Sequence, residues 1–181
     1  MSATSCARRR LIRGVRPTPS RPMFAVAQII FTSAQRVSLE SLKQFIEDRF
    51  PHKVVHAKWQ LESYVVPQLL IHTTPPFTIQ IESAEWVATE IGELPTHSDY
   101  NLPVSSTDKL LCCDARLGIM PVDDGHLVIE EPQGIWVAAV GTSLDPAIPH
   151  IGEVLRQLTV HLAGFLHDCV NGGVSDYSEL E

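Results

Sequence analysis

The sequence predicts an α+β domain in which a mostly antiparallel sheet of about six or seven strands carries three helices. Residues 77–81 alternate apolar and polar side chains with the period of a half-buried strand. Apolar residues from Ile151 onward recur at the spacing of one helix face. No internal repeat is present at the period of a solenoid, so we expect the helices to pack on a single sheet.

The chain has 181 residues, of which 44% are hydrophobic, and this is enough for one core. We predict a single domain over residues 23–181. Residues 1–22 form a basic leader that contains six arginines and no acidic residue, and we expect it to be disordered. Leu11 and Ile12 are too short an apolar stretch for a secretory signal, so the leader is either an organellar transit peptide or a basic tail. The alternative that we favour is translation from Met23, directly before the first predicted strand.

In the first half of the chain, an apolar run at residues 24–31 predicts a strand, and Ser38 is the expected N-cap of a helix that Pro51 ends. Pro67 cannot donate a hydrogen bond to a neighbouring strand, which predicts that residues 64–71 form either an edge strand or two short pieces. The other two strands expected in this half are 55–59 and 77–81, and a second helix follows over residues 83–94.

In the second half, residues 95–108 lack periodicity and predict the longest loop. A helix is predicted from Ile151 to Cys169, capped by Asn171 and Gly172 and followed by a frayed tail. Three further strands are predicted at residues 110–120, 126–130 and 135–140.

The charge of the predicted domain is strongly negative. Residues 23–181 hold 21 acidic side chains against eight basic ones, a formal net charge of −13. Nucleic-acid binding depends on positive charge, so this domain is not expected to bind nucleic acid. A basic partner would suit the charge, although a negative surface also keeps a protein in solution.

Four cysteines do not form a disulfide scaffold in a domain of this size, which favours a reducing cytoplasm. Cys112 and Cys113 are adjacent, so in a strand they point to opposite faces and cannot chelate one ion; we expect buried thiols.

The longest apolar runs are far shorter than the roughly 20 residues of a membrane helix.

No motif indicates catalysis, a metal site or a cofactor. His150, His161 and His167 are wrongly spaced along the predicted last helix to share one ion. The acidic pairs have ordinary explanations, because Asp123–Asp124 precede a turn glycine and Glu130–Glu131 end a strand.

Three hypotheses for function remain. The first is a non-enzymatic, cytoplasmic protein-binding domain, such as an inhibitor or immunity-type protein for a basic partner. Trp59 and Trp136 are in phase with apolar neighbours and are expected in the core. The candidate contact residues are Glu82, Glu85, Trp86, Glu90, Glu93 and Tyr100.

The second hypothesis is an enzyme or small-ligand binder whose site is assembled from dispersed side chains. The residues available for such a site are His72, His97, His126 and Asp114. The third hypothesis is a homo-oligomeric scaffold that assembles through the edge strand around Pro67 or through another open edge of the sheet.

Overall fold

The structure is a computed structural model that describes residues 25–74, 76–97, 100–122, 127–130, 136–138, 149–170 and 172–178. The predicted leader therefore lies outside the described residues. So do His126, the Asp123–Asp124 pair, Glu131 and Asn171, and the side chain of Trp136.

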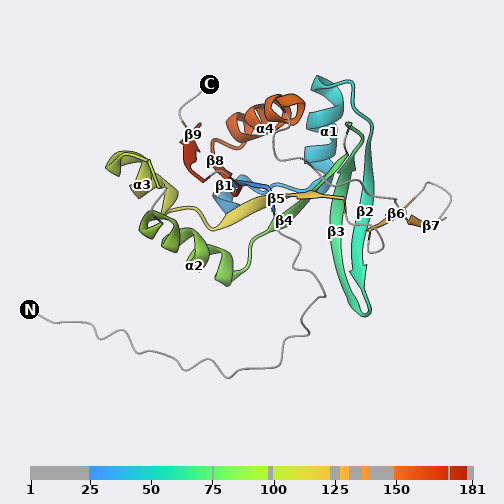
Figure 1. Cartoon of the computed structure of the whole chain (residues 1–181), viewed down its shortest axis with the longest axis horizontal. Coiled ribbons are helices and arrows are strands. Elements are labelled where there is room, and N and C mark those ends of the chain that lie inside the picture. The colour runs from blue at the N-terminus through green and yellow to red at the C-terminus, as the bar shows by residue number, and fades with distance from the viewer. Residues whose placement is uncertain are drawn as a thin grey trace, which may run out of the picture.

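The described residues form one nine-stranded antiparallel sheet with the strand order β7-β6-β2-β3-β4-β5-β1-β8-β9 (Figure 1). This confirms the predicted α+β class, with more strands and helices than expected. The strands are β1 Ala27–Phe31, β2 Val54–Leu61, β3 Tyr64–Ile71, β4 Phe77–Glu82, β5 Ala115–Pro121, β6 Leu127–Glu130, β7 Trp136–Ala138, β8 Phe165–Asp168 and β9 Val174–Asp176.

Helices lie on both faces of this sheet (Figure 1). The α-helices are α1 Leu39–Arg49, α2 Glu85–Glu93, α3 Val104–Leu110 and α4 Pro149–His161, and the short 3₁₀ helices are η1 Ser33–Gln35 and η2 Leu94–Thr96.

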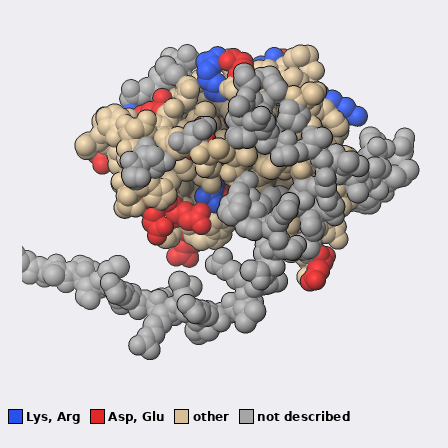
Figure 2. All heavy atoms as spheres, viewed as in Figure 1, with Lys and Arg blue, Asp and Glu red and all other residues tan. Residues whose placement is uncertain are grey.

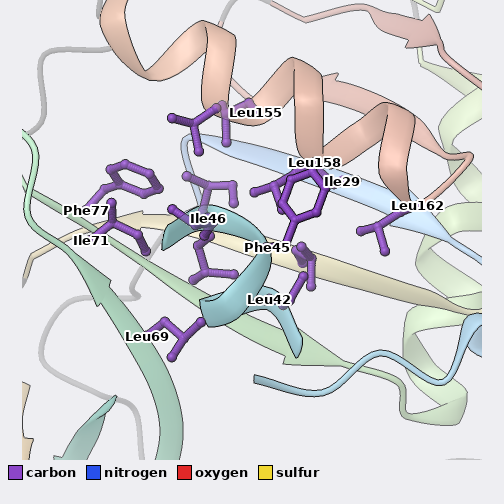
Figure 3. Close-up of a cluster of buried hydrophobic side chains, with 14 of the residues drawn as sticks. Ile29, Leu42, Phe45, Ile46, Leu69, Ile71, Phe77, Leu155, Leu158 and Leu162 are labelled. Atoms are coloured by element: carbon purple, nitrogen blue, oxygen red, sulfur yellow. The ribbon is translucent and has the colours of Figure 1, made fainter. Parts of the chain in front are cut away.

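The larger core lies between the sheet and the helices α1 and α4. Leu42 and Ile46 of α1 and Leu158 of α4 meet Ile29 of β1, and all four are buried (Figure 3). Removal of this much apolar surface from water is the main stabilising contribution to the fold.

A second core lies on the opposite face, beneath α2 and α3. Ile30 of β1 and Phe165 of β8 pack there with Val87, Ile91 and Leu110. Because successive strand residues point to opposite faces, Ile29 and Ile30 place β1 at the centre of both cores.

The start of α1 is as predicted. The side chain of Ser38 accepts a hydrogen bond from the backbone N–H of Ser41, and the Ser41 hydroxyl accepts one from the backbone N–H of Ser38. This reciprocal capping satisfies two donors that the first helical turn would otherwise leave free.

The predicted last helix is wrong beyond His161. The backbone turns at Ala163, whose φ is 45°, and residues 165–168 form β8, which pairs with β1. The backbone at Gly164 lies so close to β1 that a Cβ atom there would be 2.5 Å from the carbonyl oxygen of Ile30.

The expected cap and frayed tail are also corrected. Gly172 and Gly173 have φ values of 77° and 88°, and they form the turn between β8 and β9. Residues 174–176 are thus part of the sheet, because β8 offers them an open edge for pairing.

The predicted loop at residues 95–108 contains α3 in its second half, and the strand predicted from Leu110 begins only at Ala115. The segment around Pro67 is neither an edge strand nor two short pieces, because β3 is one continuous strand between β2 and β4. β3 pairs with β2 along its whole length but with β4 only over residues 69–71.

Within the described residues, no helix has the length and apolar character needed to span a membrane.

We predict that Gly164→Ala destabilises the protein by about 2 kcal/mol, because the new methyl group would overlap a backbone carbonyl that cannot move freely. Gly152→Ala is the matched control, since nothing lies within 4 Å of a Cβ at that position of α4. It should stabilise the protein by about 0.5–1 kcal/mol. Urea denaturation measures both, and equal effects of the two changes would contradict this account of the turn.

Candidate functional site

A row of polar side chains crosses the sheet face beneath α2. Gln28 on β1 and Arg116 on β5 each interrupt an otherwise apolar strand, and His167 lies on β8 next to Asp168. β1 lies between β5 and β8, and Gln28 is directly opposite His167 in the register. The three side chains therefore share one face and form a polar floor.

The polar row continues onto β3 and β4. The Nε2 of Gln68 donates to the Oε1 of Gln80 at 3.1 Å, and the Nε2 of Gln80 donates to Glu82. Gln68 is 1% exposed, and its Oε1 has no hydrogen-bond partner among the described residues. Since an unsatisfied buried oxygen costs stability, this row is not explained by packing alone.

Helix α2 forms one wall above this floor. Val87 and Ile91 face the core, whereas Trp86, Glu90 and Glu93 follow the spacing 0, 4 and 7 along an adjacent stripe. Figure 2 shows acidic side chains gathered over α2. The helix therefore joins the core through one stripe and presents charge and an aromatic ring on the next.

Arg116 is the central charge of the site. Its Nε lies 2.5 Å from the Oε2 of Glu82, and its Nη1 lies 2.9 Å from the Oε2 of Glu90. The guanidinium carbon is 5.0 Å from the centre of the Trp86 ring, within the range of a cation–π interaction. Arg116 is only 8% exposed, so these contacts compensate for the loss of its hydration.

A pocket of about 320 Å³ opens between the floor and α2. Its apolar wall is Ile91 and Leu94, and the polar lining includes Glu93, whose carboxylate forms no ion pair with another described residue. The complete lining is Gln28, Glu90, Ile91, Glu93, Leu94, His97, Arg116 and His167.

A second hollow, of about 210 Å³, lies beneath α4. Ile151 and Leu155 line it together with apolar residues of β1, β5 and β8, and Asp168 is its charged residue. It lacks the convergent polar groups that orient a ligand. The pocket beside α2 is therefore the stronger candidate site.

The histidine and thiol at the edge of the floor do not form an activated nucleophile. The Sγ of Cys169 lies 3.8 Å from the Nδ1 of His167, which is itself 3.3 Å from the Oε1 of Gln28. Burial raises the pKa of Cys169 to about 11. A catalytic thiol requires a lowered pKa, so this pair is unsuited to nucleophilic attack.

Cys112 and Cys113 follow α3 in a turn and not in a strand, contrary to expectation. Burial raises the pKa of Cys113 to about 12, which fits the expected buried thiol. Cys112 is exposed, so that prediction was wrong for this residue.

The candidate contact residues separate into three groups. Glu85, Trp86 and Glu93 lie on α2 with their side chains exposed, and Glu90 is half-exposed but also binds Arg116. Glu82, at the end of β4, is held by Arg116 beneath the helix. Tyr100 packs against the second core and donates a hydrogen bond from its hydroxyl to Thr107 of α3, so it holds α3 in place.

The dispersed residues of the second hypothesis do not converge among those described. His97 lines the pocket, but the backbone of His72 bonds to Lys53 at the far end of β3. Asp114 accepts hydrogen bonds from the backbone N–H and the hydroxyl of Ser33, both at 2.6 Å. The described part of the chain also contains no group of three His, Cys, Asp or Glu side chains placed to hold a metal ion.

Sequence reasoning missed Gln28, Arg116 and His167. A signal was present for Gln28 and Arg116, because each is a polar residue inside an otherwise apolar strand, but His167 lay in a segment predicted as helix. Comparison with known proteins adds no assignment, since no family model, curated protein or solved structure matches the chain.

We predict that Arg116→Met lowers the free energy of unfolding by about 3 kcal/mol, because it leaves the carboxylate of Glu82 without its cation. The double variant Glu82→Gln, Arg116→Met should recover part of that loss. A double-mutant cycle measured by urea denaturation gives the coupling between the two residues. A coupling near zero would show that the ion pair contributes nothing.

We predict that Asp114→Asn destabilises the protein at neutral pH by at most about 1 kcal/mol, since the two bonds to Ser33 are solvent-exposed. The Ser33 hydrogen bonds hold the pKa of Asp114 below its ordinary value. A carboxylate with a lowered pKa stabilises the fold above its unfolded pKa, and this contribution is lost as the pH falls through its folded pKa. The difference between wild type and variant should therefore shrink below about pH 4, and a difference independent of pH would contradict the assignment.

Proposed function

We propose that this protein is a non-enzymatic, cytoplasmic binding domain that recognises a basic segment of another protein. The contact surface is the α2 acidic surface, defined as Glu85, Trp86, Glu90 and Glu93. The observation that carries the proposal is the position of Trp86, which is 48% exposed and lies over an arginine already neutralised by two carboxylates.

Trp86 has the properties of an interface anchor. A large, half-exposed aromatic ring gains apolar contact area on binding, and tryptophan is enriched among the residues that dominate interface energies. Arg116 supports one face of the ring, which reduces the conformational entropy lost when a partner covers the other face.

The carboxylates around this ring favour a cationic partner. Glu85 and Glu93 have no ion pair with a described residue, and the domain as a whole carries excess negative charge. Exposed charges of one sign accelerate the encounter with an oppositely charged protein and oppose the approach of an anion. The α2 acidic surface therefore supports a basic protein over a nucleic acid or a phosphorylated ligand.

A small-molecule receptor is the second candidate, and the pocket beside α2 is the observation that favours it. Its volume of about 320 Å³ is at the lower end of the range for ligand sites. Its polar groups come from four separate elements, as in a site assembled by the fold.

We predict that the double variant Glu85→Lys, Glu93→Lys weakens the complex with the partner by about tenfold or more at low salt, because each change replaces attraction by repulsion. The partner would first be purified by affinity capture and identified by mass spectrometry, and its Kd would then be measured by titration calorimetry. Trp86→Ala should weaken the same complex by about 2 kcal/mol through loss of the anchor.

Glu62→Lys is the matched control for charge. Glu62 is exposed in the turn between β2 and β3, away from α2, and its reversal changes the net charge in the same direction. It should leave the Kd within about twofold, since exposed charges more than about 10 Å apart are screened at 0.1 M salt. The proposed surface would be refuted if Glu62→Lys raised the Kd as much as the double variant does. It would also be refuted if the Kd changed neither with salt nor with the substitutions at Glu85 and Glu93.

A further inference from the structure

We propose that the pocket between α2 and the strands β5, β1 and β8 binds a single lysine or arginine side chain of the partner. This inference rests on the proposed function and adds a specificity pocket to the α2 acidic surface. It predicts that the partner is recognised through one inserted cationic residue and not only by its overall charge.

The lining of the pocket matches the two chemical parts of such a side chain. Ile91 and Leu94 provide an apolar wall on α2 and η2, against which an aliphatic stem can pack. Glu90 and Glu93 lie one residue before each of them, so carboxylates accompany the apolar wall along its length. Long cationic side chains bind in this way, with the stem on apolar surface and the charged head on polar groups.

The charges of the pocket favour a cation over an anion. Arg116 is the one Lys or Arg side chain in the lining, and Glu82 and Glu90 already bind it. Glu93 has no cationic partner among the described residues, and one oxygen of Glu90 remains free of Arg116. The amide oxygen of Gln28 adds an acceptor for the N–H groups of an ammonium or guanidinium.

The volume limits the ligand to one side chain. About 320 Å³ is near the minimum for a small-molecule site, which leaves room for a lysine or arginine but not for a folded segment. Trp86, one helical turn before Glu90, would then contact the neighbouring residues of the partner. The pocket and the α2 acidic surface thus form one continuous site.

The test uses the full-length chain and small probes, so it does not require the partner. Nα-acetyl-lysine N-methylamide is titrated into ¹⁵N-labelled protein, with the norleucine analogue as the neutral control and inorganic phosphate as the anion control. We expect saturable shifts of the backbone amides of Gln28, Leu94 and His97, and binding of norleucine about tenfold weaker, since a charge-assisted hydrogen bond contributes about that factor. Equal binding of norleucine, binding of phosphate in the pocket, or no shift at these amides would overturn the proposal.

Two variants at one floor position provide the decisive comparison. Gln28→Lys places a tethered ammonium inside the pocket, so the lysine probe should lose at least tenfold in affinity. Gln28→Met removes the amide acceptor and the contact with His167 but adds no charge, so it should weaken binding of the lysine probe less than Gln28→Lys does, and equal losses in the two variants would overturn the proposal. If Gln28→Lys fails to fold, Glu93→Gln removes the unpaired charge at a surface position and should weaken the lysine probe severalfold with no change for norleucine.

The outcomes separate this inference from the proposed function. A lysine probe that does not bind, together with a partner complex that still depends on Glu85 and Glu93, would reject the pocket and leave the α2 acidic surface intact. The alternative outcome is that the lysine probe binds while the Kd of the partner complex is unchanged by Glu85→Lys and Glu93→Lys. That result would assign the pocket to a free cationic small molecule and reject its role in partner recognition.

Discussion

The architecture depends on the burial of β1 from both sides. Ile29 and Ile30 are each 0% exposed, although they point to opposite faces of the sheet. One requires α1 and α4 above it, and the other requires α2 and α3 below. The same strand carries Gln28, so the packing that holds β1 in place also fixes the floor of the candidate site.

Arg116 links the stability of this fold to its surface properties. Apolar residues in place of both Arg116 and Glu82 would avoid the cost of burying charge, since replacement of a whole buried ion pair by apolar residues is often neutral or stabilising. The guanidinium instead orients Glu82, Glu90 and the Trp86 ring around one point. The core is thereby polar where the α2 acidic surface needs support, and it is apolar beneath α1 and α4.

Local sequence signals predicted the elements that local interactions determine. The N-cap at Ser38 and the apolar stripe of α2 could be predicted from the sequence because both depend on neighbours within one or two helical turns. The end of α4 was not, since residues 165 and 166 continue the helical spacing by coincidence while their partners lie on β1. The pocket escaped prediction for the same reason, because Gln28, Arg116 and His167 become neighbours only through the strand order.

The pairing of β1 with β8 also determines when the site can appear during synthesis. Gln28 and His167 are separated by 139 positions in the chain, and they meet only after β8 has been made. Until then β1 has β5 on one side and an open edge on the other, and contacts of such long range form slowly. A ribosome-bound chain would therefore expose that edge until β8 has been synthesised, and a chaperone that covers the edge in this period would protect it from aggregation.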